Sequence, residues 1–576
     1  MDTLILMVLT FAGYIIMYRL YGRFIAHRIF KIAPDAQAPA VEFEDGIDYV
    51  PTKKEVIFGH HFTSIAGTGP IVGPAIAIIW GWVPAMIWVF VGSIVMGAVH
   101  DFGALIISMR NQGKSISDYT SKYINPRTRL IFFVIVFLEL LIVIAVFGIV
   151  IAVIFKMFPA SVLPVWLEVP IAMLLGYGVY KRSMSVTIWS IIAVVVMYIS
   201  VVIGYYVPLE MPPLAGIPPT GIWTLVLLAY AFFASVLPVT TLLQPRDFIN
   251  SHQLMIVMAL MVIGVFAASF TGNMELVAPA VQATPKDAPP LWPFLFITIA
   301  CGAISGFHSL VSSGTSSKQV RSENDSLFVG YGSMLLEGVL ATLVIIAVAA
   351  GIGLGYEVVT DGSTQILTGT AAWNTHYSSW AVADKGLGPK ISAFVIGAAN
   401  MIETFGIPHG IAVTIMGVFV ASFAGTTLDT ATRIQRYVVT EMFTGFKINI
   451  FSNRFVSTFF VVGTAAALAF ATGADGGGAL KLWPLFGAVN QTLAALALFI
   501  IALYLKRKGG MKWIIAGIPA VFMAVMTSWA TIYNQFEYLS KKNILLQIIN
   551  MVIILIVFWI LIETAIKFFK RADESE

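Results

Sequence analysis

The chain has 576 residues, of which 58% are hydrophobic and only 11% are charged. A water-exposed surface needs far more charge, so this composition excludes a soluble globular protein. The net charge of +4 is too small to indicate a nucleic-acid partner, and the single cysteine excludes internal disulfides and zinc sites built from several cysteines.

Long apolar segments recur from the first residues to the last and predict an all-α polytopic membrane protein. The N-terminal segment lacks the basic residues that open a signal peptide, so we interpret it as the first membrane helix. Counting apolar cores between helix breakers and charges gives about 15 crossings. The predicted cores are 3–20, 58–79, 82–109, 130–155, 163–180, 185–207, 219–243, 253–271, 292–316, 328–352, 391–426, 455–472, 480–505, 513–533 and 545–566.

The basic residues assign an orientation to these helices, because positive side chains collect on the cytoplasmic side of membrane proteins. A basic cluster follows every odd-numbered crossing, and the adjacent pair Lys541 and Lys542 is the exception on the other side. We therefore expect a protein of the inner (cytoplasmic) membrane, with its N-terminus outside and its C-terminus in the cytoplasm. The clusters begin at Arg19, Arg110, Lys181, Arg246, Lys318, Arg433, Lys506 and Lys567.

The eleventh predicted core, 391–426, is too long for one simple crossing of about 20 residues. Residues 400–410 (NMIETFGIPHG) interrupt it with glycine, proline and two ionisable side chains. The sequence indicates either a long tilted helix or a broken one, counted as one net crossing. Two polar stretches, roughly 28–57 and 353–389, are expected to be loops with short helices at most.

A short internal repeat relates two crossings. Residues 62–69 (FTSIAGTG) match residues 307–314 (FHSLVSSG), with conservative pairs at most differing positions. The first copy lies on a crossing that runs outward and the second on one that runs inward, as an inverted repeat requires. We interpret 1–576 as one transporter domain with a first repeat at 58–207, a second at 292–505 and accessory helices at 506–576.

Both copies are rich in glycine and hydroxyl side chains, which predicts two discontinuous helices. Inverted-repeat transporters bind their substrate where such helices unwind, near the middle of the membrane. Close packing of helices through small residues is the alternative explanation. We expect the helices to unwind at 67–70 and at 312–315. The predicted substrate-binding residues are His61, Ser64, Gly67, Thr68, Gly69, Phe307, His308, Ser309, Ser312, Ser313, Gly314 and Thr315.

Ionisable side chains inside membrane helices are costly and therefore point to function. Asp101 and Glu337 lie well inside the third and tenth crossings and are predicted to be coupling or structural carboxylates. His61 and His308 can carry protons near neutral pH, with packing roles as the alternative. His60, Glu168, Asp429 and Glu563 are assigned to span ends and Glu139 to a structural pair with a basic residue, while Glu403 and His409, in the interrupted eleventh core, are further candidates.

Enzyme and cofactor motifs are missing from the sequence. No two histidines have the i, i+4 spacing of a metal site on one helix, so no metal and no cofactor are predicted. No Walker A loop is present to bind a nucleotide phosphate, and no G-x-S-x-G motif organises a nucleophile. We therefore expect a protein that is not an enzyme and does not hydrolyse ATP.

Five ordered motifs resemble the carbon starvation protein A family. They are GHHFTSIAGTGPIVGPAIA, FHSLVSSGTSSKQ, GYGSMLLEG, SFAGTTLDTATRIQRYVVTE and LWPLFGAVNQ, spread between about residues 50 and 505. The resemblance implies a secondary transporter for pyruvate or peptides, built on inverted repeats. Repeats of five helices, as in LeuT, and of seven helices both fit the crossings, and the long eleventh crossing favours five. By analogy, its hydroxyl and carboxyl groups would bind the coupling ion: Ser422, Thr426, Thr427 and Asp429.

The sequence thus predicts a symporter that imports a small carboxylate, similar to pyruvate, together with H⁺ or Na⁺. A peptide transporter of the same fold is the first alternative. A membrane sensor is less favoured because the chain lacks a signalling domain, and a channel because broken helices indicate a site that can be occluded. The expected partners are a carboxylate or short peptide, H⁺ or Na⁺ and the lipid bilayer.

Overall fold

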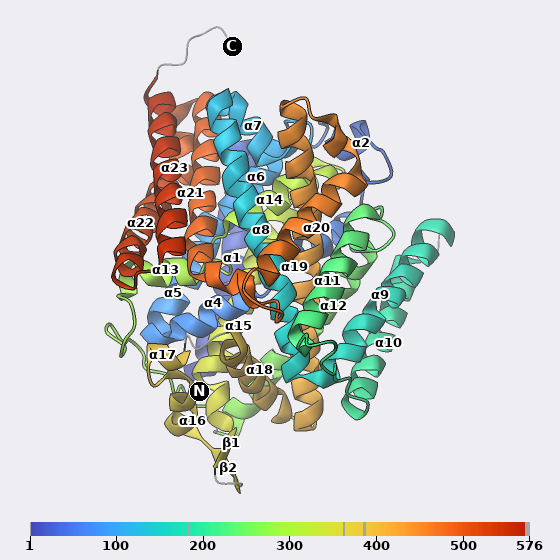
Figure 1. Cartoon of the computed structure of the whole chain (residues 1–576), viewed down its shortest axis with the longest axis vertical. Coiled ribbons are helices and arrows are strands. Elements are labelled where there is room, and N and C mark those ends of the chain that lie inside the picture. Colours follow the sequence, from blue (N-terminus) through green and yellow to red (C-terminus); the bar gives the residue numbers. More distant parts are fainter. Residues whose placement is uncertain (1, 183–184, 273, 361–362, 384–386, 571–576) are drawn as a thin grey trace.

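The computed structural model describes residues 2–570 except 183–184, 273, 361–362 and 384–386. Most helices run along the longest axis of the molecule (Figure 1). The expectation of an all-α polytopic membrane protein is confirmed.

Twelve helical segments within the described residues are long and apolar enough to cross a membrane. Six are single α-helices, and the other six join α-helices to π- or 3₁₀-helical turns. They are Asp2–Phe30 with α1 (Asp2–Met17), Trp82–Met109 with α5 (Trp82–Gly92) and α6 (Ala98–Met109), α8 (Pro126–Met157), Pro159–Val179 with α9 (Val162–Gly176), α10 (Val186–Tyr206), α11 (Pro219–Val236), α12 (Leu243–Phe270), Glu323–Leu354 with α15 (Ser333–Ala349), α19 (His409–Gly445), Gly477–Arg507 with α21 (Trp483–Arg507), Gly510–Ser540 with α22 (Ile514–Ser540), and α23 (Ile544–Phe569).

One bent pair, Lys54–Ile65 and Gly69–Trp80, brings this number to 13. The two other predicted crossings, 292–316 and 455–472, correspond to a broken helix and to the 17-residue helix α20 (Arg454–Phe470). The total of about 15 crossings therefore stays a prediction. Two short helices, α2 (Pro39–Glu42) and α7 (Ile116–Tyr123), lie outside the long segments.

The first predicted discontinuous helix is broken at 66–68, which overlaps the predicted 67–70, although Gly69 and Pro70 already belong to the next helix. Helix α3 (Lys54–Ile65) and helix α4 (Gly69–Ala77) meet at an angle of 44° across residues 66–68. Pro70 occupies the first turn of α4, where its missing N–H costs nothing, so it starts the second half-helix.

The second helix is also discontinuous, but the predicted position of its break is wrong. Helix α13 (Leu291–Thr298) and helix α14 (Gly306–Gly314) are separated by residues 299–305, and Gly302 there has φ +90°. The copied motif at 307–314 is regular helix. Its expected unwinding at 312–315 is limited to Thr315, where α14 ends.

The long eleventh predicted core is a broken helix, not one long tilted helix. Helix α18 (Leu387–Glu403) ends before residues 404–408, and α19 then continues for 37 residues. The preceding loop contains more structure than expected, including an antiparallel hairpin. Its elements are β1 (Tyr356–Thr360), β2 (Ser363–Leu367), α16 (Gly369–Tyr377) and α17 (Trp380–Ala383).

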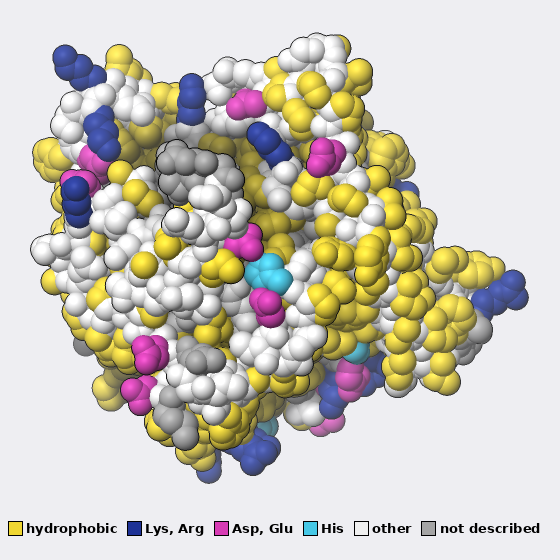
Figure 2. Space-filling model, turned by 90° about the horizontal axis from the view of Figure 1, so that it is seen from below, with side chains coloured by type: hydrophobic (Ala, Val, Ile, Leu, Met, Phe, Trp, Pro, Cys, Tyr) yellow, Lys and Arg dark blue, Asp and Glu magenta, His cyan; other side chains and the backbone are white. Residues whose placement is uncertain are grey.

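The packing places the half-helices at the centre. Helix α3 packs against α12, α14 packs against α6 and α21, and α8 runs against α19. Helices α9 and α10 form a pair at one side of the molecule (Figure 1), and the corresponding lobe carries mostly hydrophobic side chains (Figure 2). Such a surface fits contact with lipid tails.

Candidate substrate and coupling site

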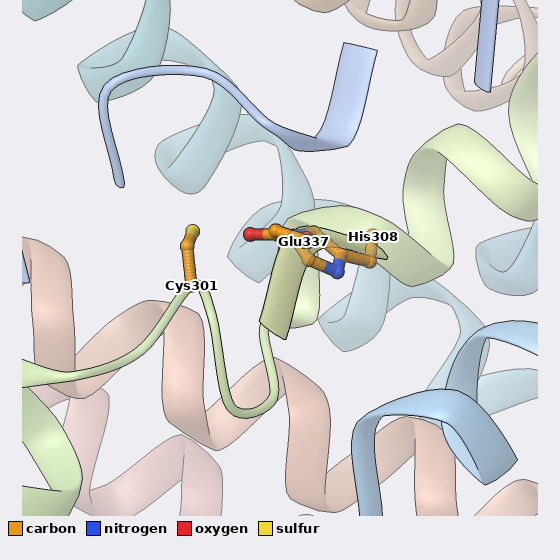
Figure 3. Close-up of side chains that lie close together, drawn as sticks. All are labelled: Cys301, His308 and Glu337. Carbon is orange, nitrogen blue, oxygen red and sulfur yellow. The ribbon is translucent and has the colours of Figure 1, made fainter. Parts of the chain in front are cut away.

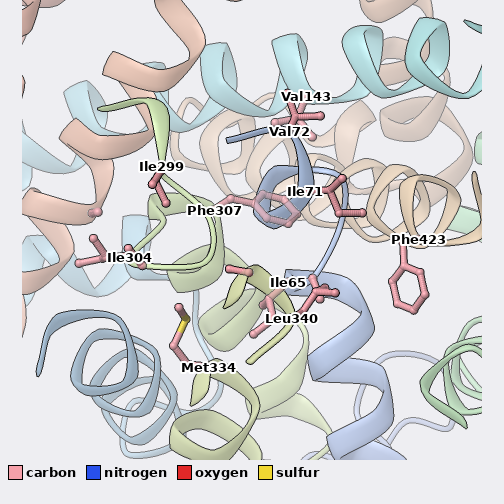
Figure 4. Packing of buried hydrophobic residues seen from close by; sticks show 14 of the residues in the cluster. Ile65, Ile71, Val72, Val143, Ile299, Ile304, Phe307, Met334, Leu340 and Phe423 are labelled. Carbon is pink, nitrogen blue, oxygen red and sulfur yellow. The ribbon is translucent and has the colours of Figure 1, made fainter. Parts of the chain in front are cut away.

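The two breaks lie close together in a tightly packed apolar surrounding. Ile65, Ile71 and Phe307 are buried and belong to one hydrophobic cluster around the half-helices (Figure 4). Phe307 is held in place by its backbone, because its N–H donates to Asn490 Oδ1 of α21 at 2.9 Å. That bond satisfies a free N–H at the start of α14, so α14 begins here as an ordered helix.

A group of four residues, called here the His308 cluster, joins α6, the second break, α14 and α15. It consists of Asp101, Cys301, His308 and Glu337, and Figure 3 shows three of these side chains. His308 Nδ1 lies 3.1 Å from Asp101 Oδ2, and His308 Nε2 lies 3.4 Å from Glu337 Oε2. Both predicted coupling carboxylates therefore meet the predicted histidine in one buried site.

The carboxyl groups of the His308 cluster have further partners. Asp101 Oδ1 lies 2.7 Å from Nδ1 of His100, and Glu337 Oε1 accepts the backbone N–H of Gly302 at 2.9 Å. The Glu337 bond reaches into the second break, so the unwound segment is tied to α15 by a side chain. An unwound backbone inside a membrane protein needs such partners.

The two adjacent histidines of α3 have different surroundings. His60 lies between Asp247, at 2.6 Å from its Nδ1, and Thr315, at 3.1 Å from its Nε2. His61 Nδ1 lies 2.8 Å from Ser316 Oγ, while its Nε2 is buried without a hydrogen-bond partner among the described residues. The prediction that His60 lies near a span end is wrong, since its side chain is fully buried.

Part of helix α19 lies against the first break, as the analogy with LeuT predicts. Thr427 donates to the backbone oxygen of Ser64 at 3.3 Å, and Ser64 Oγ lies 3.0 Å from Thr430 Oγ1. A Cβ atom on Gly67 would overlap Thr427 Oγ1, so the first break can approach α19 this closely only because residue 67 is glycine. Thr68 is buried in the same break, and a Cβ on Gly69 would lie 2.6 Å from Cys301 Cβ.

The remaining predicted residues of α14 are buried with mostly local partners. Ser309 donates to the Gly306 oxygen at 2.7 Å, and Ser313 donates to the Ser309 oxygen at 2.6 Å. Ser312 Oγ has no partner among the described residues. A Cβ on Gly314 would meet the Ile434 side chain at 3.3 Å, which is a tight but tolerable contact.

A second polar group, the Arg246 cluster, consists of Glu168, Tyr230, Arg246 and Asp429 and comes from α9, α11, α12 and α19. The Arg246 guanidinium pairs with Asp429, and its Nε lies 3.2 Å from Glu168 Oε1. Tyr230 donates to Asp429 Oδ2 at 2.9 Å. Asp429 and Glu168 were expected at span ends or in structural positions, but both are buried in this cluster.

Two of the three hydroxyl groups predicted to bind the coupling ion contact members of the Arg246 cluster. Arg246 Nη2 donates to Thr426 Oγ1 at 2.9 Å, and Ser422 Oγ donates to Glu168 Oε2 at 2.7 Å. Asn250 also donates to Thr426 Oγ1, at 3.0 Å. Three of the four predicted ion-coupling residues on α19 are thus bound to a fixed cation or its carboxylate partner.

Three more ionisable residues stand apart from these clusters. Glu403 and His409 form a pair at 2.8 Å, and both side chains are exposed. Glu563 lies at the surface, as expected near a span end, and accepts a bond from Asn125 at 2.9 Å. None of the three belongs to a buried site within the described residues.

Glu139 of α8 was expected to pair with a basic residue, and this is wrong. Both of its carboxyl oxygens are fully buried without a partner among the described residues. We expect Glu139→Leu to stabilise the protein by about 1–3 kcal/mol, because leucine removes a buried polar group that has no hydrogen bond. A thermal unfolding curve in detergent measures this, and a lower melting temperature than that of the wild type would contradict it.

A cavity of about 540 Å³ reaches the two breaks from one end of the molecule. Gly69, Ile297 and Thr298 line it beside the two breaks, and residues of α17, α21, α22 and the start of α23 are also part of its wall. Its size is within the usual range of small-molecule sites, which is about 300–1,000 Å³.

Ion pairs close the opposite end of α3 and α19. Asp48, in the loop before α3, lies 2.9 Å from Arg433 Nη1 and 3.1 Å from Arg436 Nη2, and accepts the Tyr437 hydroxyl at 2.6 Å. Burial alone would raise the pKa of Asp48, but the guanidinium groups of Arg436 and Arg433 outweigh it and hold this pKa well below its usual range. The cluster therefore stays ionised at any pH at which transport is measured.

Sequence reasoning missed Arg246, Cys301 and Asn490. Arg246 was counted among the basic loop residues after the seventh crossing, whereas α12 begins at Leu243 and includes it. The available signal was the run Pro245-Arg246-Asp247 beside an apolar segment, since Pro is common in the first turn of a helix.

The sequence is similar to those of known proteins over nearly the entire chain. The family model described as "Carbon starvation protein CstA" matches residues 2–530. The peptide transporter CstA of Campylobacter jejuni is 33% identical over 92% of this chain and 80% of the relative. The pyruvate/proton symporter BtsT of Escherichia coli is 32% identical over 90% and 79%. The peptide transporter CstA of Bacillus subtilis is 31% identical over 96% and 94%.

Among solved structures, a mutant of the manganese transporter from Eremococcus coleocola has a similar architecture. Its TM-score is 0.51 with 11% sequence identity, and the match covers 91% of this chain and 98% of that one. This likeness shows a shared LeuT-type fold and nothing about the substrate. The family match and its relatives, in contrast, extend over nearly the entire chain, which therefore belongs to the carbon starvation protein CstA family.

Proposed function

We propose that the chain imports a small carboxylate similar to pyruvate across the cytoplasmic membrane, coupled to H⁺ and by alternating access. The Escherichia coli relative is named a pyruvate/proton symporter, and the other relatives compared above are named peptide transporters. The choice of H⁺ over Na⁺ rests on the position of the Arg246 guanidinium. This group lies beside the α19 residues that the sequence predicts to bind the coupling ion.

The position of Arg246 disfavours Na⁺. Arg246 already donates to Thr426 and pairs with Asp429. A sodium ion at the same oxygens would lie about 4 Å from a second positive charge, at a cost of about 4 kcal/mol for an effective dielectric constant of about 20. A proton, in contrast, needs only a carboxylate, and the Arg246 cluster has two.

Glu168 is the better proton carrier of the two carboxylates. Each carboxylate has one oxygen without a hydrogen bond, but Asp429 Oδ2 is bound by both Arg246 and Tyr230, whereas Glu168 faces Arg246 only through Oε1, at 3.2 Å. Glu168 also lines a small cavity of about 30 Å³, which has room for a water molecule. Water there can bring the proton to Glu168 and remove it.

The substrate binds between the two breaks in this proposal. His61 Nε2 and Ser312 Oγ are buried polar atoms without partners among the described residues, one on each discontinuous helix. A carboxylate that enters through the large cavity can accept hydrogen bonds from both. The cavity end of the molecule is then the outside, and the Asp48 end is the closed cytoplasmic gate.

The packing supports two five-helix repeats with a revised composition. Helix α12 packs on α3 as α21 packs on α14, and α11 and α20 occupy matching places beside α8 and α19. The first repeat then contains α11 and α12 and ends at about residue 270, not 207. Helices α9 and α10 are then an additional pair that is inserted into the first repeat. Glu168 of α9 therefore reaches the bundle from outside the two repeats.

Peptide uptake is the second candidate, because two of the relatives compared above are named peptide transporters and the cavity of about 540 Å³ has room for a short peptide. Uptake of labelled pyruvate and labelled dialanine into proteoliposomes separates the two. Whichever compound is accumulated is the substrate class, and empty liposomes are the control.

The same vesicles test the ion. We expect an imposed pH gradient, alkaline inside, to drive accumulation with the membrane potential clamped, and a Na⁺ gradient to have no effect. Accumulation that follows the Na⁺ gradient and ignores the pH gradient would overturn the proposal. A protonophore should abolish the expected signal.

A further inference from the structure

The His308 cluster contains three donor atoms that are suited to a metal ion. One ligand atom each of Cys301, His308 and Glu337 lies within 4.8 Å of the others. In Figure 3 the Glu337 carboxyl group lies beside the His308 ring and points toward Cys301. All three residues are buried, and they come from the second break, α14 and α15.

Two of these donors have no other partner. His308 Nε2 and Glu337 Oε2 are both fully buried and make no hydrogen bond to any described residue, although they lie 3.4 Å apart. Buried polar atoms are rarely left unsatisfied, so a pair that faces one point requires an explanation. A shared ligand supplies one.

The opposite side of each donor group is already fixed. Asp101 Oδ2 lies 3.1 Å from Nδ1 of His308, and Gly302 N–H donates to Glu337 Oε1 at 2.9 Å. A carboxylate on the far nitrogen of a histidine is the usual support of a metal-binding imidazole, because it fixes the tautomer with Nε2 free. The supporting groups of a metal site are thus in place around the three donors.

The geometry points to a site for a divalent transition-metal ion such as Zn²⁺, bound by Cys301 Sγ, His308 Nε2 and Glu337 Oε2. Thiolate and imidazole favour such an ion over Mg²⁺ or Ca²⁺, which prefer oxygen ligands. The thiol proton of Cys301 is released on binding. Thiolate and carboxylate then balance the charge of the ion, so the ion and its three ligands are together neutral.

Three protein ligands leave the fourth tetrahedral position open, as in zinc sites that exchange a ligand. Cys301 packs against Gly69, which lines the large cavity, so the site adjoins a route for the ion. The ion would join the second break to α14 and α15. This inference concerns metal binding by the folded chain and does not depend on which substrate is transported.

Cys301 is the only cysteine of the chain, which makes the test specific. Purified full-length protein is stripped with a chelator and titrated with Co²⁺, whose bond to a thiolate gives a charge-transfer absorption band. We expect the band to saturate at one Co²⁺ per chain and to disappear on addition of Zn²⁺. A wild-type protein without this band overturns the proposal.

Variants assign the ligands. Cys301→Ser should lose the band, and His308→Gln and Glu337→Gln should weaken binding strongly. Asp101→Asn should weaken it about 10–100-fold, because it supports a ligand without touching the ion. His376→Gln, at a buried histidine far from the cluster in sequence, is the matched control and should bind as the wild type does.

A second measurement covers variants that fold poorly. Zn²⁺ should slow the reaction of Cys301 with a maleimide in the wild type and in His376→Gln, but not in Glu337→Gln. Equal protection in Glu337→Gln and in the wild type would contradict the assignment. So would a maleimide rate that Zn²⁺ does not change in the wild type.

Discussion

Proteoliposomes that carry Glu168→Gln should exchange substrate across the membrane but fail to accumulate it in a pH gradient. Glutamine keeps the length of the side chain and its bond to Ser422, but cannot take up and release a proton. A gradient of one pH unit stores about 1.4 kcal/mol per proton, which supports about tenfold accumulation. We expect the wild type to approach that ratio and the variant to stay near one.

Two measurements are needed on the same vesicles: accumulation in the pH gradient, and counterflow of labelled substrate without a gradient. Glu210→Gln, at an exposed loop carboxylate, is the control and should match the wild type in both. Accumulation by Glu168→Gln at the wild-type level would exclude Glu168 as the proton carrier. Loss of counterflow as well would place Glu168 in substrate binding instead.

Arg246 itself is a less informative position, for a physical reason. Removing it leaves Glu168 and Asp429 buried without their cation, and breaking a buried ion pair in this way costs about 3–5 kcal/mol. Arg246→Gln is therefore expected to unfold or misinsert, and its lack of uptake would say little about coupling. The neutral replacement of one carboxylate avoids this cost.

The sequence predicted the parts of the molecule that depend on local composition. Apolar runs predicted the membrane class, and glycine with proline predicted a break at 67–70, which overlaps the observed one at 66–68, because both effects act within a few residues. Asp101, His308 and Glu337 were singled out because a charge inside an apolar helix is costly wherever its partner lies.

The failures concern partners that are distant in the sequence. The motif at 307–314 was expected to unwind at 312–315, but the break lies before it, at 299–305. The Asn490 side chain caps the start of α14, and no residue near Phe307 in the sequence indicates that bond. Arg246 was read as a loop residue because a helix start can be misplaced by several residues. Its partners, Glu168 and Asp429, lie on two other helices.

Gly67→Ala should reduce uptake strongly although it adds a single methyl group. The new Cβ would overlap Thr427 Oγ1 and lie 3.1 Å from the Phe147 ring, so α3 and α19 could not approach as they do here. Overpacking of this kind costs about 1–3 kcal/mol. Applied to the equilibrium between transport states, that is a loss of about 5- to 150-fold, measured as initial uptake at equal amounts of inserted protein.

The matched control is Gly463→Ala, a helical glycine of α20 with nothing within 4 Å of its new Cβ, and it should leave uptake unchanged. Gly314→Ala should have a milder effect than Gly67→Ala, because the nearest Ile434 atoms lie 3.3 Å away. Thr427→Ala in the Gly67→Ala background removes the hydroxyl group that the new Cβ would overlap and should restore part of the activity. Full uptake by Gly67→Ala alone would show that transport does not need this close contact between the first break and α19.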